Sequence, residues 1–213
     1  MKLKLINILT IFLVIASFVL AIGLYAHFPD KVASHWDAAG QVNGFMSKAW
    51  GLFLMPVVGL VMVLLLYFLP KLDPLKQNYE KFQKEFDYFI FGIMLFLFYI
   101  YLLTIFWNLG SVFNMSKAIV PAIGMLFIII APLLRKAKRN YFVGIRTPWT
   151  LANDEVWNKT HKLAAILFYV LGLITLLGFF YDKYVFYVFL VGILLVVIIL
   201  FVYSYLLYRG IKK

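Results

Sequence analysis

The sequence predicts an all-α, polytopic membrane protein with six transmembrane helices. Hydrophobic residues make up 65% of the 213 residues and the mean hydropathy is +0.95, whereas soluble domains are about 45–50% apolar. Because a charge at a helix centre costs about 2.5–3.5 kcal/mol, charge-free runs long enough to cross a core of about 30 Å indicate spans. Six such runs occur, at 5–26, 49–69, 88–109, 118–134, 163–181 and 184–208.

The first and fourth runs need separate justification. Lys2 and Lys4 precede the first run, as in a signal peptide. Its apolar stretch is longer than the 7–15 residues of a signal-peptide core, so we expect a retained helix. The fourth run is the shortest and contains Pro121 and Pro132, so it is the span that the sequence supports least strongly.

Lysine and arginine predict the orientation. Sixteen of the twenty lie in the N-terminus, the second and fourth connections and the C-terminus, and four lie in the other connections. The positive-inside rule therefore places both termini in the cytoplasm. The net charge of +11 is mostly a consequence of this topology, so the bilayer is the expected partner of the basic residues and direct nucleic-acid binding is not predicted.

The chain 1–213 is expected to form a single membrane domain with two long motif loops. One is external, at 27–48, and one is cytoplasmic, at 135–162, where connections between helices usually need only 2–8 residues. Each joins the first two spans of a set of three, on opposite sides, which is the layout of a 3+3 inverted repeat. The charged connection 70–87 is either an amphipathic segment lying on the membrane surface or an extension of the third helix.

The external loop carries a mixture of polar and aromatic residues. Its first part permits a short helix that stops at Gly40, and Asn43-Gly44 is typical of a turn. Four side chains are weak candidate metal ligands without a firm ligand spacing: His27, Asp30, His35 and Asp37. In the alternative interpretation Trp36 lies among the lipid headgroups and His35 binds the backbone. The absence of cysteine excludes disulfides and thiolate sites.

The cytoplasmic loop contains a conformationally restricted piece, 144–149. Gly144 permits positive φ, and Pro148 holds Thr147 in extended geometry. Asn153 is the expected N-cap of a helix that continues into the fifth span. The side chains with binding chemistry are Arg146, Trp149, Trp157 and His161. They form either a pocket for an anionic or peptidic partner or a packing surface that holds the loop on the bundle, with Arg146 paired to Asp154 or Glu155.

Both loops resemble known motifs. The cytoplasmic motif comprises Asn140, 144–151, Val156-Trp157 and Thr160-His161-Lys162, and it is similar to that of the SdpI family of multi-pass membrane proteins. The external loop resembles a domain of unknown function that often accompanies it, on Pro29, Val32, His35, Trp36, Gly40, Asn43, Ser47 and Lys48. Ala33 stands where a second proline is common and Asp37 where asparagine is common.

The resemblance implies a prokaryotic plasma-membrane immunity and signalling protein without catalysis or cofactors. Family resemblance implies protection against a secreted, membrane-active peptide toxin and recruitment of a cytoplasmic transcriptional repressor. The expected toxin-facing residues are His35, Trp36, Asp37 and Lys48, and the expected repressor-facing residues are Arg146, Trp149, Trp157 and His161. The alternatives are a transporter or exporter of a small peptide or solute, and a metal-dependent membrane enzyme. The transporter alternative lacks the ionisable residue at membrane depth that an ion-coupled carrier usually has. The enzyme alternative lacks a hydrolase motif.

Overall fold

Six long helices form the body of the protein and confirm the six predicted spans, of which the end of the fifth, at 178–181, lies mostly outside the described residues. The computed structural model describes residues 4–177, 180 and 184–211. Within this part, six helices are long and apolar enough to cross a membrane. Their bounds are α1 Leu5–Leu24, α2 Lys48–Leu72, α3 Gln83–Asn108, α4 Met115–Lys136, α6 Asp154–Leu177 and α7 Val185–Ile211. Pro121 and Pro132 lie inside α4, which continues through both.

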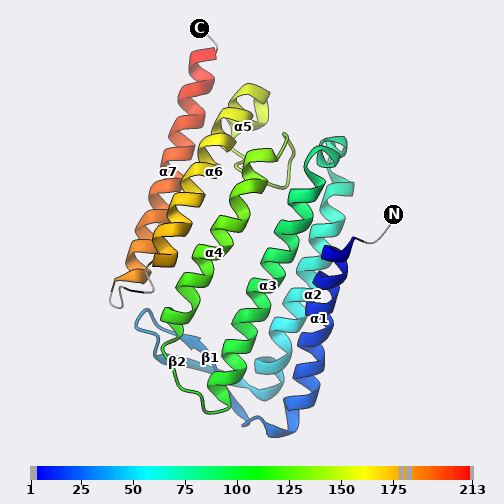
Figure 1. The fold of residues 1–213 in the computed structure, drawn as a ribbon, viewed down its shortest axis with the longest axis vertical. Helices are drawn as coiled ribbons and strands as arrows, with labels where there is room; N and C mark the ends of the chain where they lie inside the picture. The colour runs from blue at the N-terminus through cyan, green and yellow to red at the C-terminus, as the bar shows by residue number, and fades with distance from the viewer. Residues whose placement is uncertain (1–3, 178–179, 181–183, 212–213) are drawn as a thin grey trace.

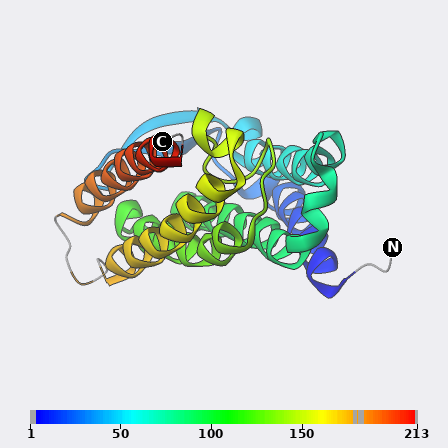
Figure 2. The same ribbon diagram turned by 90° about the horizontal axis from the view of Figure 1, so that it is seen from above.

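The helices form two groups of three (Figures 1 and 2). Helices α1, α2 and α3 pack on one another, as do α4, α6 and α7, and α3 packs against α4 between the groups. Glycine allows α4 and α6 to approach closely, because a Cβ on Gly124 would lie 2.7 Å from the carbonyl oxygen of Gly172 and the reverse also holds. The inverted relationship between the two groups and the cytoplasmic placement of the termini stay predictions.

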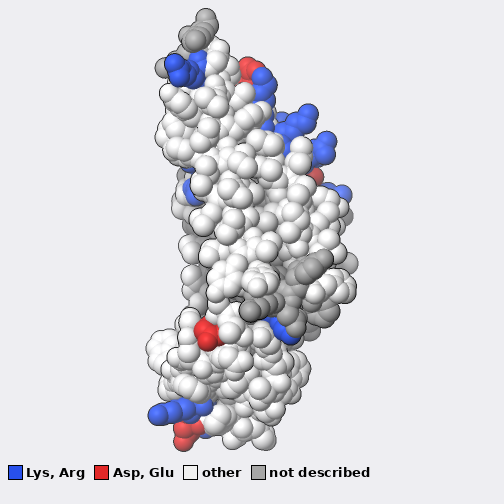
Figure 3. Space-filling view, turned by 90° about the vertical axis from the view of Figure 1, so that its left-hand side faces the viewer, with Lys and Arg blue, Asp and Glu red and all other residues white. Residues whose placement is uncertain are grey.

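The two motif loops lie at opposite ends of the bundle (Figure 1). We call these the hairpin end, formed by residues 27–47, and the loop end, formed by residues 73–82 and 137–153. The beginning of α1 and the end of α7 lie toward the loop end. On the face shown in Figure 3, Lys and Arg gather at the ends of the molecule and the middle is largely uncharged, as a bilayer requires.

A two-stranded antiparallel sheet replaces the predicted short helix at the hairpin end. Strands β1 Lys31–Trp36 and β2 Val42–Ser47 follow the short 3₁₀ helix η1 Tyr25–His27 and pair from Lys31 with Ser47 to Trp36 with Val42. Gly40, at φ +77°, lies in the connecting turn. The Asn43-Gly44 prediction of a turn was wrong: Gly44 lies in β2 opposite His35, where a Cβ would be 2.8 Å from His35 Cβ.

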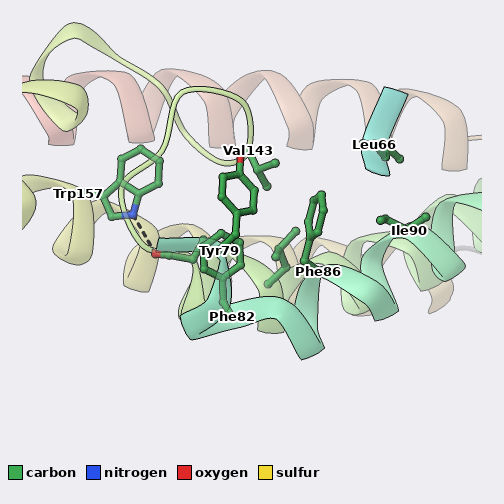
Figure 4. Close-up of a cluster of buried hydrophobic side chains, with 9 residues drawn as sticks. Leu66, Tyr79, Phe82, Phe86, Ile90, Val143 and Trp157 are labelled. Atoms are coloured by element: carbon green, nitrogen blue, oxygen red, sulfur yellow. Dashed lines mark hydrogen bonds between the residues drawn. The ribbon is translucent and has the colours of Figure 1, made fainter. Parts of the chain in front are cut away.

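The segment before α3 turns its aromatic side chains toward protein and leaves its charged side chains exposed. It forms the 3₁₀ helix η2 Lys76–Phe82, which leads directly into α3. Tyr79, Phe82 and Phe86 are almost fully buried and pack in one cluster with Val143 and Trp157 (Figure 4). The aromatic face of this segment is thus covered by residues 137–143, which sequence periodicity alone does not place there, and its position relative to the membrane surface stays a prediction.

One carboxylate lies buried near the start of α3. The side chain of Asp87 is only 2% exposed and forms an ion pair with Lys4 Nζ at 2.7 Å, and its other oxygen accepts a hydrogen bond from Gln83 Nε2 at 2.7 Å. Lys4 is half exposed. The N-terminal end of α1 is thus tied to α3 by a charge pair.

Candidate functional site

His161 fixes the backbone of the loop end. Its Nε2 accepts the N–H of Ile145 at 3.0 Å, and its Nδ1 lies 2.8 Å from the carbonyl oxygen of Trp157. Because a backbone N–H can only donate, Nε2 carries no proton and Nδ1–H donates to Trp157. Gly144, at φ +112°, passes so close that a Cβ there would overlap His161 Nε2. The ring is buried and neutral, and both of its nitrogens form hydrogen bonds.

Trp157 joins the same arrangement from one turn earlier on α6. Its side chain is fully buried and stacks on the His161 ring with centroids 4.0 Å apart. Its Nε1 donates a hydrogen bond to Ala137 O at 2.9 Å (Figure 4). Two ring groups on one helix face therefore hold both ends of the segment 137–145.

Asn140 organises the middle of that segment together with Asp73 and Tyr79. The fully buried Asn140 Oδ1 accepts the N–H groups of Phe142 and Val143 and the hydroxyl of Tyr79 lies 3.1 Å away. Asp73, which is 2% exposed, accepts the N–H of Tyr141 at 2.8 Å. This polar cluster ties the segments that precede α3 and that follow α4 to each other.

The restricted piece 144–149 has the predicted conformation and leads into a short helix, α5 Pro148–Ala152. Thr147 is extended and caps α5 through a reciprocal capping box with Thr150. Thr147 Oγ1 also donates to Ser204 Oγ of α7 at 3.0 Å. Trp149 is half-buried against Phe201 and Tyr205 of α7. The predicted N-cap of α6 is confirmed, since Asn153 Oδ1 accepts two N–H groups of the first turn.

The acidic partners predicted for Arg146 bind other basic residues. Arg139 pairs with Asp154 at 2.8 Å, and Lys159 pairs with Glu155 at 2.7 Å. Arg146 is exposed and donates to the carbonyl oxygen of Tyr141 at 2.7 Å. The predicted pairing was wrong because one turn of α6 places Lys159 beside Glu155, and because Arg139 reaches Asp154 from across the loop.

The four predicted residues of the cytoplasmic loop are therefore not brought into one pocket. Trp157 and His161 stack inside the bundle, Trp149 lies against α7, and Arg146 lies on the surface. The interpretation in which the loop packs on the bundle therefore fits Trp149, Trp157 and His161. Arg146 keeps a charge available for a partner.

The hairpin end contains a largely apolar cavity of about 560 Å³. The hairpin forms its outer wall, and α2, α3, α4 and the start of α7 form the others. Its lining includes three predicted site residues, His35, Trp36 and Asp37, together with Leu54, Thr104 and Ile119. A volume in the range of small-molecule sites, with few polar groups, suits an apolar ligand or an apolar part of a larger one.

Asn108, the last residue of α3, holds the hairpin over this cavity. Its Oδ1 accepts the N–H of Ala33 at 2.8 Å and its Nδ2 donates to the Ala33 carbonyl at 3.1 Å. A proline at position 33, where the resembling motif commonly has one, would lack the N–H that Asn108 binds. Ala33, which departs from the motif, thus supplies the N–H group that Asn108 binds.

The four predicted external residues take different positions. His35 is exposed and binds the Asn43 side chain, not the backbone. Trp36 packs edge-on against Trp107 with centroids 5.9 Å apart, so it is a packing residue, and its place among the lipid headgroups stays a prediction. Asp37 Oδ1 accepts the N–H of Gln41 in the turn. Lys48 pairs with Asp30 at 3.2 Å, between the start of α2 and the residue before β1.

The candidate metal ligands are not brought together. Across the described residues, no group of three or more His, Cys, Asp or Glu side chains is placed to hold a metal ion. Asp30 is engaged with Lys48, His35 with Asn43 and Asp37 with the turn, while His27 ends η1.

Sequence reasoning missed the residues that bind the loops from a distance. Asn108, Asn140, Tyr79 and Asp73 each join segments far apart in the chain. The sequence did contain a chemical indication of these residues. A buried polar side chain needs a hydrogen-bond partner, and this applies to a polar residue at the end of an apolar helix and to the acid directly after Pro70-Lys71-Leu72.

Comparison with known proteins agrees with both motif loops. The model of the SdpI/YfhL protein family matches residues 136–204, and that of a domain of unknown function, DUF1648, matches residues 12–60. Immunity protein SdpI of Bacillus subtilis (strain 168) is 31% identical over 205 residues, covering 95% of this chain and 96% of that protein. No solved structure matches the chain. With this identity over nearly its whole length, the chain belongs to the SdpI family of multi-pass proteins of the cell membrane.

Proposed function

We propose that this chain is an immunity protein of the SdpI type that protects its cell from a membrane-active peptide toxin. The observation that carries the proposal is the full-length similarity to an immunity protein, together with an apolar cavity under the matched hairpin. The six helices keep the cavity at one end of a membrane-spanning bundle. A toxin that inserts into membranes presents apolar side chains of the kind that such a cavity accepts.

At the loop end, the finer proposal is recruitment of a cytoplasmic repressor by the exposed surface around Arg146 and Tyr141. Both side chains are exposed, and the guanidinium is held over the loop by its bond to the Tyr141 carbonyl. Trp149, Trp157 and His161 then act as positioning residues, because their contacts are with α7 and with the loop backbone.

Helix α3 is one of the elements that reach both ends of the bundle, as α2 and α4 also do. Asn108 at its end binds the hairpin, and Phe86 near its start packs in the cluster under residues 137–143. A small shift of α3 caused by toxin binding would therefore change contacts at both ends, which is the physical requirement for coupling two sites.

The experiment uses cells of Bacillus subtilis that lack the relative's gene and that are exposed to that strain's secreted toxin peptide. Expression of the chain is expected to restore survival. Killing equal to that of cells with an empty vector, with the chain present in the membrane fraction, would contradict the proposal. Recruitment is measured separately, by the amount of repressor in the membrane fraction, which Arg146→Gln is expected to lower without loss of survival.

A further inference from the structure

A second cavity, of about 510 Å³, lies between α4 and α6 toward the loop end. Arg135 of α4 and Lys162 of α6 line it at that end, and Ala131, Ala165, Tyr169 and Val170 line its apolar part. Ala131 and Ala165 are small and buried, whereas Tyr169 and Val170 are about half exposed. The result is a groove with two cations at one end and hydrocarbon along its length.

The two cations are available for a ligand. Arg135 and Lys162 are exposed, and neither forms an ion pair with any residue in the described ranges. The neighbouring Arg139 and Lys159 are neutralised by Asp154 and Glu155. The groove therefore presents two unpaired positive charges from two different helices.

We propose that this groove binds one anionic phospholipid. The phosphate lies between Arg135 and Lys162, and an acyl chain follows Ala131, Ala165 and Tyr169. Arginine binds phosphate through its planar fork and lysine adds a point charge. Basic pockets between transmembrane helices on the cytoplasmic side are suited to anionic headgroups, and the positive-inside rule places this end in the cytoplasm. The proposal is independent of the immunity function.

The test uses the purified full-length chain and dioleoylphosphatidylglycerol. Native mass spectrometry of the detergent-solubilised protein is expected to show one retained phosphatidylglycerol and no retained phosphatidylcholine at equal concentration. The double variant Arg135→Gln/Lys162→Gln is expected to bind phosphatidylglycerol roughly thirty-fold more weakly, since each cation near a headgroup contributes about 1 kcal/mol. The matched control, Lys136→Gln/Lys138→Gln, removes two exposed cations of the same segment that do not line the groove.

A second variant tests the acyl part while keeping both charges. Val170→Trp fills the groove, and Val197→Trp adds the same side chain on the exposed face of α7. Only the first is expected to lose the retained lipid. Equal loss in the two charge variants, unchanged binding in Val170→Trp, equal retention of phosphatidylcholine, or displacement of the lipid by millimolar inorganic phosphate alone would each overturn the proposal.

Discussion

His161 Nε2 accepts the backbone N–H of Ile145 at 3.0 Å, so a side chain of a membrane-spanning helix fixes the conformation of the loop that carries the family motif. The second ring nitrogen is occupied by the Trp157 carbonyl, which leaves no free position on the imidazole. His161 of the motif thus has a structural role, and its ring is not part of the surface available to a partner.

We expect His161→Phe to destabilise the loop end. The variant keeps the aromatic stack on Trp157 but leaves the Ile145 N–H without an acceptor, which costs about 1–3 kcal/mol. Denaturant unfolding in detergent measures the free energy of unfolding, and limited proteolysis measures the opening of residues 137–153. Lys159→Gln removes only an exposed ion pair and should change stability by less than about 1 kcal/mol. Equal stability of His161→Phe and wild type would contradict this role.

Gly144→Ala is expected to be more harmful than Gly110→Ala. Both glycines have positive φ, at +112° and +102°, so both variants carry backbone strain of about 1–3 kcal/mol. Only at position 144 does a Cβ also overlap His161 Nε2, since nothing lies within 4 Å of a Cβ at position 110. In a His161→Ala background the two penalties should become similar. Unequal penalties there would show that another contact limits position 144.

Asn108→Leu should loosen the hairpin. Ala33 is 1% exposed, and the variant leaves both its N–H and its carbonyl without the Asn108 amide. Hydrogen exchange of residues 31–47 is expected to speed up at least tenfold, because about 1.4 kcal/mol corresponds to a factor of ten. Asn43→Ala, which removes only the bond to His35, serves as the control. Unchanged exchange in Asn108→Leu would contradict the proposed attachment.

Lys4→Ala should cost more stability than Lys4→Ala combined with Asp87→Asn. The single variant leaves the buried Asp87 carboxylate without its cation, which costs about 1–3 kcal/mol or more for a charged group. The double variant removes the charge and keeps an amide beside Gln83. A thermal-unfolding cycle of the four proteins measures the coupling. Additive effects would show that the pair does not contribute.

The local parts of this structure followed from sequence, and the parts built by distant contacts did not. The spans, the positive φ at Gly144, the extended Thr147 and the Asn153 cap depend on single residues or short patterns. The hairpin was missed because its strands are stabilised by pairing with each other and by Asn108, seventy-five positions after Ala33. The β-strand propensity of a short stretch of sequence includes neither the pairing of the two strands nor the contact with Asn108.

The candidate site shows the same division. Family motifs identified His161 and Trp157, but their burial and their partners depend on how α6 packs under residues 137–145. One of the two interpretations paired Arg146 with Asp154 or Glu155, which are near it in sequence. In the structure Arg139 reaches Asp154 across the loop, and Lys159 lies one helical turn from Glu155. The cavity under the hairpin could not be predicted, since five separate elements enclose it.

The survival of toxin-exposed cells that carry either of two tryptophan variants of α2 tests most directly whether the toxin binds in the cavity under the hairpin. Leu54 lines the cavity under the hairpin, while Leu64 is exposed on the same helix and does not line it. Both proteins are compared at equal amounts in the membrane fraction and at equal melting temperature, with Thr104→Trp as a second cavity-filling variant. We expect cells with Leu54→Trp and Thr104→Trp to be killed and cells with Leu64→Trp to survive like wild type. Full survival with both cavity-filling variants would contradict binding of the toxin in this cavity.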